Sequence, residues 1–63
     1  MVSILKIERI KQEINQLDLW SKTGIPQWRI SLIERGISPR EDEAKKIADA
    51  LGCDSKYLFP GGS

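Results

Sequence analysis

The sequence predicts an all-α domain of five short helices, in which residues 15–35, approximately, form a helix-turn-helix. Glycines and prolines divide the chain into short segments, and each segment carries helix signals rather than the alternation of a strand. Two segments of about eight residues are separated by a turn of three to four residues that contains a glycine. With 63 residues, of which 40% are apolar, the chain can form one small core. A domain of this size is expected to be only marginally stable.

The first two helices are predicted from an apolar stripe and a capping residue. The first is expected at about residues 4–13, where Ile7, Ile10 and Ile14 fall within about 60° of one another around the helix. Asn15 is a good N-cap residue for a second helix that continues to residue 22. A tight turn follows, in which Gly24 is expected to supply a left-handed backbone.

Prolines mark the start of the next two helices. Pro26 is expected at the first position of the third helix (26–35), because a missing N–H costs nothing there. Ser38 and Glu41 have the spacing of a capping box, with Pro39 as the first residue of the fourth helix.

The C-terminal part is expected to hold one last short helix. Gly52 ends the fourth helix, and a final turn or two follows at residues 55–59, capped by Asp54 or Ser55. The single domain is therefore expected to cover residues 1–60, with a flexible tail at residues 61–63.

The composition argues against an enzyme. The chain has no histidine and one cysteine, Cys53, so it lacks the usual zinc ligands and any Ser-His or Cys-His pair. We expect no catalytic residue, no metal and no cofactor. A single cysteine favours a reducing, cytoplasmic location, and the apolar runs are far shorter than the ~20 residues of a membrane span.

The net charge of +1 hides an uneven distribution. Residues 1–40 hold seven Lys/Arg and four Asp/Glu, whereas residues 41–63 hold three and five. The basic part permits a phosphate partner without requiring one. The acids at 41–43 are interpreted as a solvated first helical turn, where negative charge suits the helix dipole.

A carboxylate falls on the inward side of the third helix. If Ile30 and Ile33 face the core, Glu34 lies on the same side, where an unpaired charge is costly. Arg9 lies away from the isoleucine stripe of the first helix, so it is the expected partner, in a bidentate ion pair. The alternative is a surface glutamate near the end of its helix.

The opposite face of the third helix carries large apolar side chains. Trp28 and Leu32 stand at i and i+4 and point outward with Ser31, while Gln27 and Arg29 flank them. Exposed apolar neighbours usually mark a contact surface. The alternative is that they pack on the ends of the chain itself.

At this point the sequence resembles the Cro/cI-type (XRE) helix-turn-helix proteins, typified by lambdoid phage repressors, over residues 5–59. The residues that carry the resemblance are Arg9, the Gln16-x-x-Leu19 pair, Gly24, Ile30, the run Ile33-Glu34-Arg35-Gly36, and Ala48-x-Ala50-Leu51-Gly52. The resemblance implies a compact five-helix domain of the lambda-repressor-like type, whose third helix enters the DNA major groove. It also implies an internal ion pair between Arg9 and Glu34.

The sequence departs from the family pattern in places. Trp20 stands where the family usually has alanine, so it must turn aside or push the second and third helices apart. Thr23 replaces a usual aliphatic residue, and Trp28 and Leu32 replace polar base readers. These departures leave the expected fold unchanged and weaken any transfer of base specificity.

Phosphate contacts are expected on both sides of the third helix. The N-terminus of the second helix offers free N–H groups, with Asn15 as its cap and Gln16 as a side-chain donor. Arg35 and Arg40, with the loop between them, are expected to hold a second phosphate. Such contacts set the register of the protein on DNA.

Base contacts are expected from the exposed front of the third helix. Gln27 suits adenine, Arg29 suits guanine or a phosphate, and Ser31 is permissive. Leu32 and Trp28 suit thymine methyl groups or the sugar edge.

One such module buries on the order of 600–1,000 Å², so we expect a homodimer on a pseudo-palindromic site with half-sites about 34 Å apart. Candidate dimer residues are Tyr57, Leu58 and Phe59, or else Ile7 and Ile10. The alternative for Leu58 and Phe59 is that they cap the core.

The predicted function is a sequence-specific DNA-binding regulator, a repressor or activator of the phage or mobile-element type. Two other hypotheses remain. The first is a protein-interaction module that uses the exposed face of Trp28 and Leu32. The second is a DNA-binding antitoxin that holds a toxin on another face.

Overall fold

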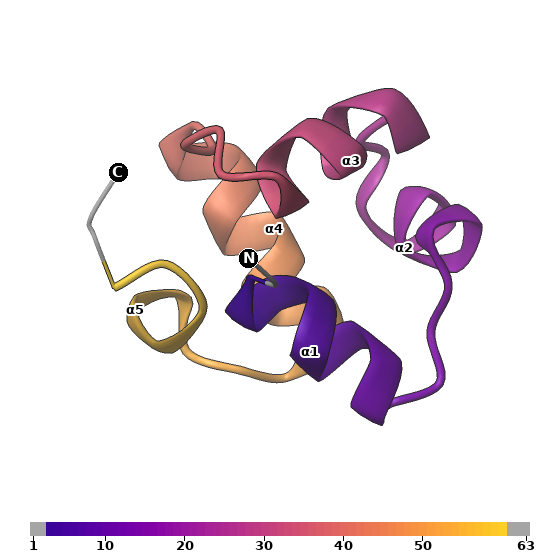
Figure 1. The fold of residues 1–63 in the computed structure, drawn as a ribbon, viewed down its shortest axis with the longest axis horizontal. Helices are drawn as coiled ribbons and strands as arrows, with labels where there is room; N and C mark the ends of the chain where they lie inside the picture. The colour runs from indigo at the N-terminus through magenta and orange to yellow at the C-terminus, as the bar shows by residue number, and fades with distance from the viewer. Residues whose placement is uncertain (1–2, 61–63) are drawn as a thin grey trace.

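The computed structural model describes residues 3–60, and the expected tail at 61–63 lies outside the described residues. Five helices and no strand occur in this part of the chain, as predicted. They are α1 (Ile4–Lys11), α2 (Gln16–Thr23), α3 (Gln27–Glu34), α4 (Glu41–Leu51) and α5 (Ser55–Leu58). Figure 1 shows the other helices gathered around α4. Among the described residues, no helix has the length and apolar character that crossing a membrane requires.

The hydrophobic core receives side chains from every helix. Leu5, Leu19, Ile30 and Ile47, from α1 to α4 in turn, are completely buried, and Leu58 of α5 closes the cluster. The remaining buried members are Ile25, Ile33, Ala48 and Leu51. In so small a core, truncating one of these side chains to alanine costs about 2–5 kcal/mol.

The first helix ends earlier than predicted. It stops at Lys11 instead of residue 13, and Glu13 adopts a left-handed backbone with φ of 57°. Two side-chain bonds to main-chain carbonyls hold the chain here: Gln12 Nε2 donates to Leu51 O at 2.8 Å, and Arg9 Nη1 donates to Ile14 O at 2.8 Å. These tertiary contacts outweigh the tendency of the local sequence to continue the helix.

The face that α1 turns inward is not the face of its isoleucine stripe. Leu5 and Arg9 are buried, whereas Ile7 and Ile10 are 47% and 56% exposed. Ile14 follows the helix and packs only partly against the core. Because Leu5 and Arg9 are four residues apart, they share a face, and the stripe is left on the other side.

The second helix and its turn have the predicted caps. Asn15 Oδ1 accepts from the Asp18 N–H at 2.7 Å, and the Asp18 carboxylate accepts from the Asn15 N–H at 3.3 Å. Gly24 ends α2 with φ of 77°. Thr23, a departure from the family pattern, donates to Leu19 O at 2.7 Å and accepts from the Ile25 N–H at 3.1 Å. Its hydroxyl therefore ties the turn together.

Pro26 lies one residue earlier in its helix than predicted. It is the N-cap of α3, with an extended ψ of 150°, and the helix begins at Gln27. The Pro26 carbonyl accepts from the N–H groups of Arg29 and Ile30, both at 3.0 Å. The fixed φ of proline suits this position as well, since a cap also donates no helical hydrogen bond.

The capping box predicted from Ser38, Pro39 and Glu41 is wrong. The N-cap of α4 is Arg40, and the helix begins at Glu41. The carboxylate of Glu43 accepts from the Arg40 N–H at 2.9 Å. The same spacing of three residues is used, but two residues further along the chain, because Glu43 is buried and held there by a contact with α3.

Candidate nucleic-acid interface

Arg9 of α1 and Glu34 of α3 form a buried bidentate ion pair. The Arg9 Nε lies 2.7 Å from Glu34 Oε2, and Arg9 Nη2 lies 3.3 Å from Glu34 Oε1. The two residues are only 8% and 7% exposed. The third guanidinium nitrogen of Arg9 donates to Ile14 O. This pair therefore fixes the end of α3 against α1 and the start of α2.

Two glutamines extend this pair towards the surface. Gln16 Nε2 donates to Glu34 Oε1 at 3.1 Å, and Gln16 Oε1 accepts from Gln27 Nε2 at 3.2 Å. A chain of hydrogen bonds thus runs from buried Arg9 through Glu34 and Gln16 to Gln27, the exposed first residue of α3. An amide nitrogen carries two hydrogens, so Gln27 keeps one donor and its oxygen for an outside partner.

Trp28 dominates the exposed side of α3. It is 66% exposed, and it follows Gln27 directly in the first turn of the helix. Ser31 and Leu32, predicted to share its face, are half-buried. The face is therefore apolar at its beginning and becomes partly covered one turn further along.

Arg29 is turned towards α4. Its Nε and Nη2 donate to the two carboxylate oxygens of Glu43, each at 2.9 Å. This hydrogen-bonded contact lowers the pKa of Glu43 to about 2; burial opposes the shift, and the Arg40 N–H supports it. The same contact raises the pKa of Arg29. Two nitrogens of a predicted DNA-contacting side chain are thus used within the protein.

Sequence reasoning missed the role of Glu43, which was interpreted as part of a solvated helical turn. A signal was present in the spacing. Glu43 stands four residues before Ile47, which is completely buried, so both residues share the inward face of α4. A carboxylate on that face needs a cation, just as Glu34 does.

The residues predicted to contact phosphates come from the segments before and after α3. Asn15 and Gln16 stand at the start of α2, before α3, while Arg35 and Arg40 bracket the segment that leads from α3 to α4 (Figure 1). Asn15, Arg35 and Arg40 are exposed, and Gln16 is half-buried by its two partners. Gln16 contacts the first residue of α3 and Arg35 follows its last residue, so polar groups lie at both ends of this helix.

Trp20 turns aside and does not separate the helices. It is 44% exposed, while the bond between Gln16 of α2 and Gln27 of α3 stays at 3.2 Å. The departure from the family's usual alanine is thus accommodated at the surface.

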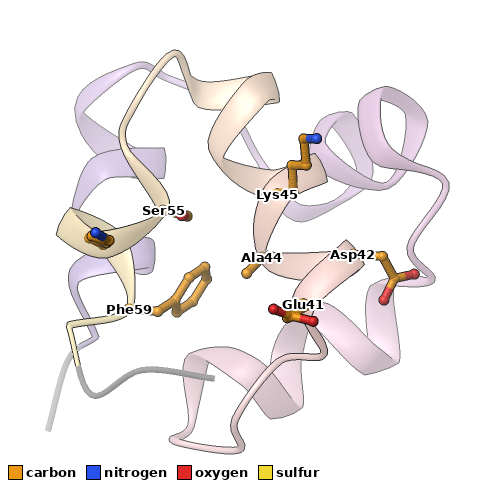
Figure 2. A pocket seen from close by; sticks show the side chains of 7 residues that line it. Glu41, Asp42, Ala44, Lys45, Ser55 and Phe59 are labelled. Atoms are coloured by element: carbon orange, nitrogen blue, oxygen red, sulfur yellow. The ribbon is translucent and has the colours of Figure 1, made fainter.

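A groove of about 630 Å³ lies between the start of α4 and α5. Figure 2 shows the ring of Phe59 and Ala44 within it, with the carboxylates of Glu41 and Asp42 on the α4 side. The other lining residues are Lys45, Ser55 and Lys56. Its mixed charges and its two carboxylates do not suit a phosphate backbone, and no residue of α3 lines it.

The fold and the flanked helix define a helix-turn-helix domain of the DNA-binding class. The profile of a helix-turn-helix family matches residues 5–58, a stretch that includes all of α2 to α5 and most of α1. The chain belongs to the Cro/cI-type (XRE) helix-turn-helix family. It is a DNA-binding transcription regulator of that type, and the family is not enzymatic.

Proposed function

We propose that this protein is a sequence-specific regulator, a repressor or activator of the phage or mobile-element type, that docks α3 in the major groove of double-stranded DNA. The observation that carries this proposal is the amide of Gln27. It is exposed at the first residue of α3 and oriented by Gln16, which Glu34 orients in turn. A pre-oriented side chain loses less entropy on binding, and a glutamine amide matches adenine N6 and N7.

Trp28, Ser31 and Leu32 complete the proposed base-contacting face, next to Gln27. Arg29 takes part through the outer edge of its guanidinium, where Nη1 keeps both hydrogens and Nη2 keeps one, because Glu43 accepts one bond each from Nε and Nη2. The pair with Glu43 fixes the direction of the guanidinium, and the free N–H groups on Nη1 and Nη2 suit a phosphate or the O6 and N7 of guanine.

Two phosphate clamps hold the helix in register in this proposal. Asn15 and Gln16 present the N-terminus of α2 to one phosphate. Arg35 and Arg40, both exposed, hold another. Because these contacts release counterions, binding is expected to weaken steeply with salt.

The proposed regulator acts as a homodimer on a pseudo-palindromic operator, because one module buries too little surface for tight specific binding. Ile7, Ile10 and Tyr57 are each about half exposed, which supports them as candidate dimer residues. Leu58 is left out because it is buried in the core, and Phe59 is half-buried. We place the protein in the cytoplasm, where a single unpaired cysteine stays reduced.

Selection of bound duplexes from a random DNA pool at near-physiological salt tests the proposal. We expect an enriched palindrome that the Gln27→Ala variant binds at least tenfold more weakly. Lys46→Ala, on the exposed side of α4, is the control and is expected to bind as the parent does. A pool that shows no enrichment contradicts the proposal.

One observation favours a second candidate function, in which a face of this domain holds a partner protein, as in an interaction module or an antitoxin. An exposed tryptophan such as Trp28 is a typical anchor of protein interfaces. In that case the partner stays bound in salt that dissociates DNA, and Trp28→Ala releases it.

A further inference from the structure

We propose that Trp28 reads thymine, through contact of its indole ring with the 5-methyl group in the major groove. This inference rests on the proposed docking of α3 on DNA and names the base feature that the helix recognises. It rests on two observations about the first turn of α3: Trp28 is exposed, and the guanidinium of Arg29 is bound to Glu43.

Trp28 is the most exposed large apolar side chain in the described part of the chain, at 66%. Its predecessor, Gln27, is held by Gln16, and its successor, Arg29, is held by Glu43. The first turn of α3 therefore presents one fixed amide and one indole. The positive charge of Arg29, the next residue, is paired with Glu43 of α4.

The major groove offers one apolar feature to such a surface. Its base edges carry hydrogen-bond donors and acceptors, except for the methyl group at C5 of thymine. An indole face pressed against any other edge removes polar atoms from water without replacing their hydrogen bonds, which is unfavourable. Pressed against a methyl group, it buries apolar surface on both sides.

Leu32 stands four residues after Trp28 and thus lies on the same side of the helix. It is half-buried, so its position is fixed by contacts within the domain. Trp28 and Leu32 together form an apolar strip along the exposed side of α3. Trp20, the other tryptophan, lies on α2 and is 44% exposed, so it offers a matched control.

The test uses the duplex enriched from the random pool and variants in which single thymidines are replaced by deoxyuridine, which lacks only the methyl group. We expect one such position in each half-site to weaken binding by about fourfold. That factor corresponds to about 0.8 kcal/mol, the burial free energy of one CH₂ group. Replacement by 5-bromodeoxyuridine, whose bromine has nearly the size of a methyl group, is expected to restore binding.

Trp28→Ala is expected to bind the thymidine and deoxyuridine duplexes equally, whereas Trp20→Ala keeps the fourfold difference. Full binding of every deoxyuridine duplex by the parent protein overturns the inference while leaving DNA docking intact. The same holds for an enriched site without thymine, or for a methyl effect that survives in Trp28→Ala. A pool without any enriched duplex overturns both proposals.

Discussion

Arg29 donates two parallel hydrogen bonds of 2.9 Å to Glu43 and so joins α3 to the first turn of α4. The same carboxylate accepts from the Arg40 N–H, at the end of the loop between these helices. The side chain of Glu43 therefore holds both the proposed recognition helix, through Arg29, and the end of the loop between Arg35 and Arg40. The position of one phosphate clamp relative to the base-contacting face depends on this junction.

The junction predicts a specific loss of stability in acid. The pKa of Glu43 is about 2 in the folded chain, against an ordinary value of 4.5. A lowered folded-state pKa adds stability that is complete above 4.5 and is lost as the pH falls towards 2. We expect Glu43→Gln to be less stable than the parent at pH 7 and to lose less stability between pH 4.5 and 2. Urea unfolding across this range measures both.

Glu41→Gln provides the control for this acid effect, because Glu41 lies in the same turn and is exposed. Its stability curve is expected to run parallel to that of the parent. Equal pH slopes for the parent and Glu43→Gln between pH 4.5 and 2 would show that the contact with Arg29 is not maintained in solution.

The buried pair of Arg9 and Glu34 predicts a large cost for removing one partner. Arg9→Ala and Glu34→Ala are each expected to lower the free energy of unfolding by roughly 3–5 kcal/mol, because the remaining charge stays buried without a counterion. Lys11→Ala is the control: Lys11 pairs with Glu8 at 3.6 Å, and its side chain is 65% exposed. Such an exposed pair is worth about 0–1 kcal/mol. Similar costs for all three variants in urea unfolding would argue against a buried pair.

The bond between Gln16 and Gln27 predicts coupled effects on DNA binding. Gln16→Ala is expected to weaken binding for two reasons: its phosphate contact is lost, and Gln27 loses its orientation. In a double-mutant cycle measured by titration of the operator, the two substitutions are expected to be non-additive by about 0.5–3 kcal/mol. Strictly additive losses would mean that the two glutamines act independently.

The two arginines that flank the loop after α3 predict a loss of affinity without loss of specificity. Arg35→Ala and Arg40→Ala are each expected to weaken operator and non-specific DNA alike, since phosphates carry no sequence information. Each is also expected to reduce the slope of log K against log salt by about one. A change in the preferred base at any position would instead indicate a direct base contact.

Several parts of this molecule follow from local chemistry and were predicted. Asn15 caps α2 because its short side chain reaches an N–H three residues later. Gly24 ends α2 because a left-handed φ of 77° costs glycine little. The partnership of Arg9 with Glu34 was also expected, because a carboxylate beside Ile30 and Ile33 needs a cation.

Other features depend on neighbours that are distant in the sequence. The true cap of α4 is Arg40 rather than Ser38, because Glu43 is already held by Arg29. Ile7 and Ile10 form a regular helical stripe but stay exposed, because Leu5 and Arg9 fit the core and its ion pair. Periodicity describes which residues share a face, and it does not specify which face meets the rest of the chain.

The sequence by itself determined the five helices, most of their ends and the family, since caps, turns and helical spacing act over three to four residues. The tertiary structure alone decided where Arg29 points, which face of α1 is buried, and how Gln16 holds Gln27. The side chains of Arg29 and Gln16 are long enough to reach several partners, and α1 could turn either of its faces to the core. Only the packed arrangement of the helices selects the partner that satisfies the buried charges and amides together.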